Sequence, residues 1–137
     1  MKKKNIWIDV EAPLELHEDN RGRIVDVFFK HNIEHVAVID SKKGAKRGDH
    51  YHKHSVQHML MTKGSMEYWY KPLNSEENPK CILLKIGDIL TTPPDEIHAL
   101  RFPEDAQFIV FSEGVRGGKD YESDTFRIQG TIVPEKR

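Results

Sequence analysis

Short apolar runs separated by turn residues follow one another along the whole chain. In residues 65–70 apolar and polar positions alternate with a period of two, as in a strand with one buried face. No stretch keeps a helical period of 3.6 residues for more than about two turns. The pattern therefore predicts an all-β fold with strands at residues 6–10, 23–29, 35–39, 56–62, 65–71, 81–85, 88–92, 97–101, 107–111 and 125–128.

The breaks between these runs are short and rich in turn residues. They include Asn20-Arg21-Gly22, Lys63-Gly64 and Pro93-Pro94-Asp95, each of which fits a connection between neighbouring strands. We find no internal repeat, no linker and no low-complexity segment in the 137 residues. A chain of this length has room for one domain with its own core, so we expect a single domain over residues 1–137.

Composition excludes several classes of protein. The chain has 21 basic and 22 acidic residues, a net charge of −1, whereas a nucleic-acid-binding domain is expected to be basic. No apolar run approaches the ~20 residues that cross a bilayer, and the start of the chain does not resemble a secretion signal. We expect Lys2-Lys3-Lys4 to be a solvated tail and Cys81, in the apolar run 81–84, to be a buried structural thiol. These features together predict a reducing, cytoplasmic setting.

The segment Arg47-Gly48-Asp49-His50-Tyr51-His52-Lys53 carries the candidate chemistry. Alternate side chains of a strand share a face, so His50 and His52 can both point into a barrel. Gln57 follows five positions later, and His98 comes on a distant predicted strand. Two imidazoles on one strand and a third on another make a facial set of nitrogen ligands that suits zinc, iron or nickel and leaves positions open for a substrate.

The same residues resemble both short motifs of the cupin superfamily. The stretch from Gly44 through His50, His52 and Gln57 to Gly64 is similar to the first motif, and the stretch from Gly87 to His98 is similar to the second. The resemblance implies a double-stranded β-helix, the jelly-roll barrel. It also implies a metal site made of His50, His52, Gln57 and His98. Many metal cupins have glutamate at the position of Gln57, and the missing charge should weaken metal binding and leave a bound metal more electrophilic.

A narrower resemblance concerns the substrate. The order Arg-Gly-x-His-x-His-Lys and then Gln at residues 47–57 is similar to dTDP-sugar 3,4-ketoisomerases, and Arg-Gly-x-His-Tyr also resembles dTDP-4-keto-sugar 3,5-epimerases. This implies a nucleotide-sugar substrate, a homodimer, contacts from Arg47, Lys53 and Gln57 to the substrate, and metal-free proton transfer by His50 and His52. The ketoisomerases have a tyrosine on the preceding strand, where residues 35–39 have none, and they lack a clear counterpart of His98.

We therefore hypothesise an isomerase or epimerase that acts on a nucleotide-linked keto sugar. An unperturbed imidazole pKa of about 6.5 suits a group that both takes and gives a proton. In this scheme His50 is the base, His52 steadies the enediolate, and His98 holds a metal or donates a hydrogen bond to the carbonyl. Two alternatives stay open: a metal-dependent cupin of other chemistry, such as a dioxygenase or small-acid isomerase, and a non-catalytic cupin that binds a small molecule.

Other polar residues have simpler interpretations. Arg47 is equally suited to a phosphate or to a salt bridge at the barrel mouth. We expect His54 and His58 at the surface or supporting the site. Residues 114–119 fit a loop over the barrel mouth, and residues 120–124 fit a solvated turn.

Overall fold

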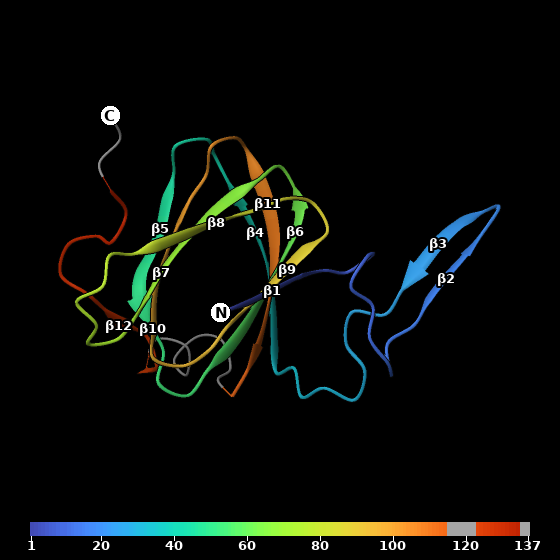
Figure 1. The fold of residues 1–137 in the computed structure, drawn as a ribbon, viewed down its shortest axis with the longest axis horizontal. Helices are drawn as coiled ribbons and strands as arrows, with labels where there is room; N and C mark the ends of the chain where they lie inside the picture. The colour runs from blue at the N-terminus through green and yellow to red at the C-terminus, as the bar shows by residue number, and fades with distance from the viewer. Residues whose placement is uncertain (115–122, 135–137) are drawn as a thin grey trace.

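The computed structural model describes residues 1–114 and 123–134, and it arranges ten strands in two facing sheets (Figure 1). The first sheet has the order β1 (Lys2–Asn5), β9 (Asp88–Thr92), β6 (Val56–Lys63), β11 (Ala106–Glu113) and β4 (His35–Ser41). The second has the order β12 (Phe126–Arg127), β5 (Lys46–Tyr51), β10 (Glu96–Arg101), β7 (Met66–Pro72) and β8 (Lys80–Leu84). All pairings are antiparallel, and the two facing sheets confirm the predicted all-β jelly roll.

The barrel interior follows from the alternation of side chains along each strand. On β11, Ala106, Phe108, Val110 and Ser112 are buried, and the residues between them are partly exposed. Residues of this kind from both sheets pack into one core, whose largest fully buried members are Tyr68, Phe102, Phe108, Met61, Met66, Leu84 and Leu90. The core fills one part of the space between the sheets and leaves the other part for polar groups.

The connection from β6 to β7 needs a residue without a side chain. Gly64 has a φ of +71°, and a Cβ atom placed there would overlap the carbonyl oxygen of Asp105. Glycine adopts this backbone conformation without strain, and a residue with a side chain would displace the neighbouring loop.

The amino-terminal segment corrects two expectations. Lys2-Lys3-Lys4 is not a solvated tail, because it forms β1 and pairs with β9. The predicted strand at residues 6–10 is wrong, since residues 6–8 form a turn in which the Trp7 N–H donates to the Asn5 side chain. The prediction followed the apolar residues of this segment, but lysines suit an edge strand, where their charge discourages pairing with another chain.

Cys81 also differs from its prediction. It is exposed on β8, the edge strand of the second sheet, whereas Leu84 on the same strand is fully buried. The run 81–84 is apolar on both faces of the strand, so the pattern did not show which face would be covered.

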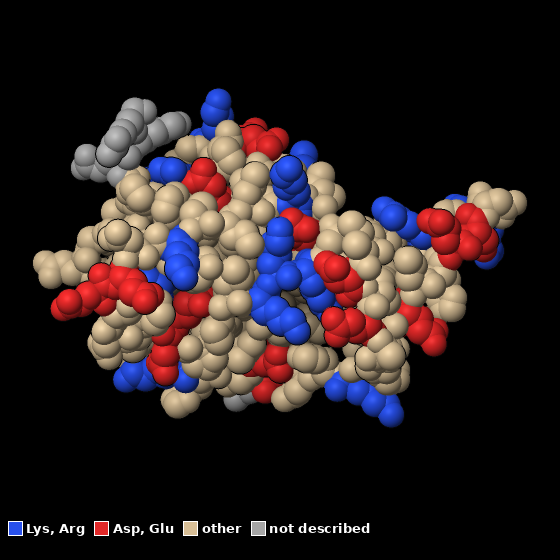
Figure 2. All heavy atoms as spheres, in the orientation of Figure 1, with Lys and Arg blue, Asp and Glu red and all other residues tan. Residues whose placement is uncertain are grey.

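A third pair of strands projects from the barrel. β2 (Leu16–Asp19), which the apolar pattern did not predict, and β3 (Gly22–Val25) form a hairpin that extends away from the two sheets in Figure 1. Ile24 on this hairpin is 69% exposed. Basic and acidic side chains are interspersed over the face drawn in Figure 2, in keeping with the balanced composition. Within the described residues, no helix is long and apolar enough to cross a membrane.

Candidate active site

Three histidines meet inside the barrel near one end of the second sheet. His50 lies on β5 opposite His98 on β10, and His52 follows β5 directly. Their ring centroids are 4.9 Å apart for His50 and His52, 4.7 Å for His50 and His98, and 5.5 Å for His52 and His98. One nitrogen from each ring lies within 4.8 Å of the others, so the structure brings together the three imidazoles that the spacing predicted. We call His50, His52 and His98 the inner triad.

The main chain fixes two of these rings. His52 donates from Nδ1 to the carbonyl oxygen of Asp124 at 2.9 Å, and His98 donates from Nδ1 to the carbonyl oxygen of Glu96 at 3.0 Å. Because a carbonyl oxygen only accepts, Nδ1 carries the proton in both rings and Nε2 of the neutral ring carries a lone pair. His98 is 1% exposed, and its Nε2 has no hydrogen-bond partner among the described residues.

Burial keeps His50 and His98 neutral. The pKa of His50 falls to about 3, chiefly because burial penalises the charged ring and also because His98, His52 and Arg127 lie nearby. The pKa of His98 falls to about 4 through burial, against the opposing hydrogen bond to Glu96. The expectation of a pKa near 6.5 is therefore wrong at both positions. A neutral His98 also cannot donate from Nε2 to a substrate carbonyl, as one version of the sequence hypothesis required.

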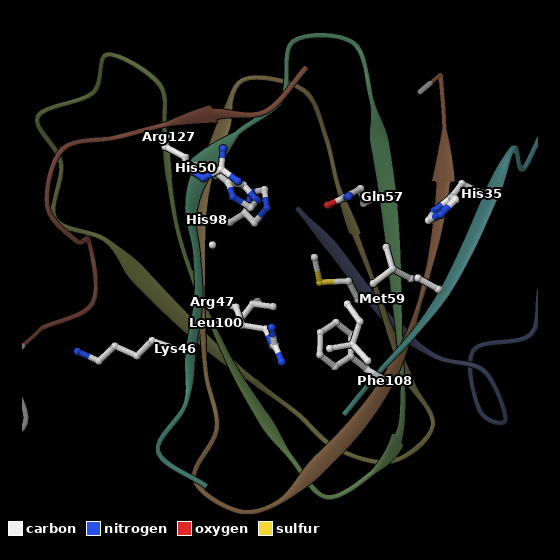
Figure 3. Close-up of a pocket in the computed structure, with 14 residues that line it drawn as sticks. His35, Lys46, Arg47, His50, Gln57, Met59, His98, Leu100, Phe108 and Arg127 are labelled. Carbon is white, nitrogen blue, oxygen red and sulfur yellow. The ribbon is translucent and has the colours of Figure 1, made fainter. Parts of the chain in front are cut away.

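The pocket beside the triad has a volume of about 500 Å³. Figure 3 shows His50 and His98 on one wall and Gln57, from β6, on the opposite wall with its side chain directed toward them. The lining combines the cationic residues Arg47 and Arg127 with the apolar residues Met59, Leu100, Phe108 and Val110. Lys46 also borders the pocket, but its side chain is directed away from it in Figure 3. Polar groups on an apolar lining of this size are typical of a small-molecule site.

The remaining predicted substrate contacts lie in different places. Arg47 lines the pocket, and its guanidinium donates to Ser41 Oγ at 2.8 Å and to the Asp40 carbonyl oxygen at 3.1 Å. Within the described residues Arg47 forms no salt bridge, so its charge is not neutralised there. The Lys53 ammonium lies 4.6 Å from the centre of the Phe126 ring, and Lys53 is not among the residues that line the pocket.

Two pocket residues were missed by the sequence analysis. His35 lies on β4 with Ala37 and Ile39, and all three line the pocket because they alternate along one face of the strand. This alternation was a usable signal for His35. Arg127 reaches the pocket because β12 pairs with β5 and places it opposite His50. A strand of two residues gives no periodic signal, so Arg127 could not be found in this way.

The expected solvated turn at residues 120–124 is wrong at Asp124, which is buried. Residues 120–122 lie outside the described residues. The buried carboxylate of Asp124 accepts the backbone N–H groups of Lys53, His54 and Ser55 at 3.0, 3.1 and 2.8 Å. Burial would raise the pKa of Asp124, but these three hydrogen bonds outweigh it and lower the pKa. The side chain thus fixes residues 53–55 while its own carbonyl oxygen fixes the His52 ring. The expected loop at 114–119 also lies outside the described residues, apart from Gly114.

The inner triad fits a divalent metal by the chemistry of its donors. Metal-bound imidazoles usually donate their other ring nitrogen to a carbonyl or carboxylate, as His52 and His98 do here. A metal also needs neutral rings, and the lowered pKa values of His50 and His98 provide them. Gln57 could add an amide oxygen but no charge, so among the described residues the donor set has no carboxylate.

Comparison with known proteins agrees with this architecture. Residues 17–94 match the model of a family described as polysaccharide biosynthesis C-terminal domain. No curated protein matches the sequence. The fold is similar to a 3,4-ketoisomerase from Helicobacter canadensis, with 22% identity over 93% of this chain and 92% of that one and a TM-score of 0.70.

Two further solved structures show the same fold. One is dTDP-4-dehydrorhamnose 3,5-epimerase from Sulfolobus tokodaii, with 20% identity over 88% of this chain and 76% of that one and a TM-score of 0.68. The other is a mutant of the 3,4-ketoisomerase QdtA from Thermoanaerobacterium thermosaccharolyticum, in complex with TDP-4-keto-6-deoxyglucose. It has 19% identity over 84% of this chain and 83% of that one, with a TM-score of 0.67. At these identities the similarity establishes the RmlC-like cupin fold.

Proposed function

Because the chain belongs to the polysaccharide biosynthesis C-terminal domain family, we propose that it is an isomerase or epimerase of a nucleotide-linked keto sugar. The structural relatives include a ketoisomerase bound to TDP-4-keto-6-deoxyglucose and an epimerase of a dTDP-linked sugar. The observation that carries the proposal is the position of His50, an unprotonated imidazole that lines a pocket together with Arg47 and Arg127.

The cationic groups suit the substrate's diphosphate. Arg47 and Arg127 line the same pocket as His50, and a guanidinium can bind two phosphate oxygens at once. Arg47 is held by Ser41 and by a main-chain oxygen, so it is positioned before a ligand arrives. Gln57, on the opposite wall, offers both an amide donor and a carbonyl acceptor to the sugar. Lys53, on the Phe126 ring, remains a predicted substrate contact outside the pocket lining.

The chemistry moves a carbonyl group between adjacent carbons without gain or loss of atoms. A base removes the proton from the carbon that bears a hydroxyl beside the carbonyl, and the electron pair of that C–H bond forms the C=C bond of an enediolate. A proton then adds to the former carbonyl carbon, and the hydroxyl proton passes from one oxygen to the other. Epimerisation uses the same removal but returns the proton to the opposite face of the carbon.

We assign the proton removal to His50. Its ring is unprotonated at neutral pH and lines the pocket, whereas the rings of His52 and His98 are each tied to a main-chain carbonyl oxygen. His52 and His98 are positioning residues that pack against it. A base with a pKa of about 3 accepts a proton reluctantly, so a substrate that carries a diphosphate and a developing enediolate must raise the pKa when it binds.

The test is exchange of a substrate proton with solvent deuterium, followed by NMR on TDP-4-keto-6-deoxyglucose. Positioned acid–base catalysis contributes about 10²–10⁴-fold, so His50→Ala should slow exchange and turnover by that factor. His54→Ala is the matched control, because His54 is exposed and lies close in sequence. If the rate of deuterium exchange in His50→Ala stays within a few-fold of the wild-type rate, His50 is not the base that removes the proton. Tight binding with no exchange in the wild type would favour a non-catalytic cupin instead.

The second candidate is a metal-dependent cupin of other chemistry. It is favoured by the buried Nε2 of His98 and by the three ring nitrogens within 4.8 Å of one another. His50, His52 and His98, with Gln57, would hold the ion, and a bound ion would supply a Lewis acid to a substrate oxygen. Deuterium exchange by chelator-treated protein at the wild-type rate would reject this candidate. Activity that returns only with added zinc, iron or nickel would support it.

A homodimer is also part of our proposal. Leu16 and Ile24 of the hairpin are exposed and available for contact with a second copy.

A further inference from the structure

A second cluster of ligand-type side chains lies on the outer face of the first sheet. His58 follows Gln57 on β6, so it points away from the pocket, and Glu113 ends the neighbouring strand β11. His31 comes from the segment between β3 and β4. One ligand atom from each of His31, His58 and Glu113 lies within 4.8 Å of the others. We call these three residues the outer triad.

The three side chains converge on one oxygen atom. Nε2 of His31 lies 2.9 Å from Glu113 Oε2, and Nε2 of His58 lies 2.5 Å from the same oxygen. Since a carboxylate only accepts, each Nε2 carries a proton in this arrangement. A tetrahedral Zn²⁺ with bonds of 2.0–2.2 Å holds its ligand atoms about 3.4 Å apart. Separations that widen by less than about 1 Å would therefore admit an ion in place of the two protons.

Thr91 supports the ring of His58 in either state. Its Oγ1 lies 2.8 Å from His58 Nδ1. A hydroxyl can donate as well as accept, so Thr91 can donate to Nδ1 while Nε2 is protonated and accept from Nδ1 once Nε2 binds a metal. A partner of this kind on the second ring nitrogen is usual for metal-bound histidine.

An apolar wall and an open side surround the cluster. Phe28 packs edge-on or tilted against both imidazoles, with centroids 5.1 Å from His31 and 5.1 Å from His58. His58 is buried, whereas the side chains of His31 and Glu113 are 39% and 27% exposed, so an ion can enter from solvent. A cavity of about 300 Å³ adjoins His31 and His58 and leaves room for a water molecule as fourth ligand.

We propose that His31, His58 and Glu113 form a metal site for Zn²⁺ or a similar divalent ion, distinct from the inner triad. Two imidazoles and one carboxylate are a donor set that zinc accepts, with water in the fourth position. The ion fastens the segment between β3 and β4 to strands β6 and β11, because His31 belongs to that segment and the other two ligands belong to the sheet. The inference stands independently of the proposed activity.

The experiment measures zinc bound per chain by equilibrium dialysis and mass spectrometry, after removal of metals from the full chain. His31→Gln and Glu113→Gln should each lose one equivalent, or at least tenfold in affinity, compared with wild type. His17→Gln is the matched control, because His17 and Glu15 form an exposed pair at 3.0 Å and are not among the clustered ligands. His17→Gln should bind zinc as the wild type does.

A His98→Gln background separates the two triads. The outer equivalent should persist in His98→Gln and disappear when Glu113→Gln is added. The loss of zinc caused by Glu113→Gln is also measured in the wild-type background. The test therefore does not depend on whether His98→Gln folds. As a second readout, zinc should slow amide hydrogen exchange in residues 26–34 of the wild type but not of Glu113→Gln. Equal zinc binding by His31→Gln, Glu113→Gln and His17→Gln would overturn the proposal, as would wild type that binds no zinc.

Discussion

The inner and outer triads belong to different sheets of the barrel, and they are built differently: the inner triad lies inside the barrel on the second sheet, and the outer triad lies on the outer face of the first sheet. Two rings of the inner triad are held by main-chain carbonyl oxygens, whereas the members of the outer triad are held by one another and by Thr91. The inner triad has no carboxylate and is mostly buried. The outer triad has Glu113 at its centre and is partly open to solvent.

The inner triad is preorganised by its main-chain hydrogen bonds, whereas the outer triad can change its contacts. Main-chain bonds keep the rings of His52 and His98 in place whether or not an ion is bound, so the inner triad can form without metal. In the outer triad the hydrogen bonds use the same atoms that would bind an ion, so binding must exchange one set of contacts for the other. The inner triad is therefore suited to orient a substrate, and the outer one to respond to metal.

The largest effect is expected where the support of the inner triad is removed. Asp124→Ala leaves three backbone N–H groups near His52 without their acceptor, which should lower the free energy of unfolding by about 3 kcal/mol. Urea denaturation measures this loss. Asp124→Asn keeps one acceptor oxygen and should lose less. Zinc binding by the outer triad should survive in both variants while folded. An Asp124→Ala chain as stable as wild type would show that residues 53–55 do not need the Asp124 carboxylate.

The two triads should change the free energy of unfolding in different ranges of pH. Since the pKa values of His50 and His98 are lowered to about 3 and about 4 from 6.5, the unfolded chain binds protons between pH 6.5 and 4 that the folded chain does not. The free energy of unfolding of metal-free protein should therefore fall as the pH drops through this window. The pKa of Glu113 is lowered below 4.5, because the hydrogen bonds from His58 and His31 outweigh burial, so its contribution is lost only at lower pH.

Two variants check the assignment of these windows. In chemical denaturation at a series of pH values, His98→Gln should show a shallower decline between pH 6.5 and 4. Glu113→Gln should be less stable than the wild type by a constant amount above pH 4.5, and this difference should shrink below pH 4.5 as the wild-type carboxyl becomes protonated. A decline that is unchanged in His98→Gln would contradict the inner assignment.

The smallest effect comes from making the inner triad resemble the outer one. Gln57→Glu places a carboxylate on the pocket wall that faces His50 and His98 (Figure 3). Attraction between a carboxylate and a divalent ion should tighten zinc binding by on the order of tenfold. The titration is done in Glu113→Gln protein, in which the outer triad is impaired. Unchanged affinity would mean that residue 57 does not reach an ion in the inner triad.

Most inner strands could be predicted because an apolar run or a period of two marks them in the sequence, but β5 lies outside the predicted strands. The period of two in β7 and the bounds of β9 appear directly in the sequence. Edge strands were harder, since β1 consists largely of lysines and β8 is apolar on both faces. There the choice between buried and exposed depends on neighbours that lie far away in the sequence, as the exposure of Cys81 shows.

The candidate site divides in the same way. The spacing of His50, His52 and His98 placed three rings in one cluster, because register within a strand and a known motif both constrain it. The lowered pKa values of His50 and His98 could not be predicted, since they depend on burial by the whole barrel. His58 was expected at the surface or in support of the site. It is buried because Phe28, from a segment without a periodic pattern, packs over it.

The contact between Gly48 and β10 restricts how this protein can evolve. Gly48 has a φ of +89°, and a Cβ atom there would lie 2.8 Å from the carbonyl oxygen of His98, beside the register shift between His98 and Ala99. A substitution at residue 48 therefore pushes on the strand that carries a histidine of the site, although Gly48 has no side chain of its own. Among random variants, changes at this position should be removed by selection as strictly as changes in the histidines, and compensating changes should arise on β10.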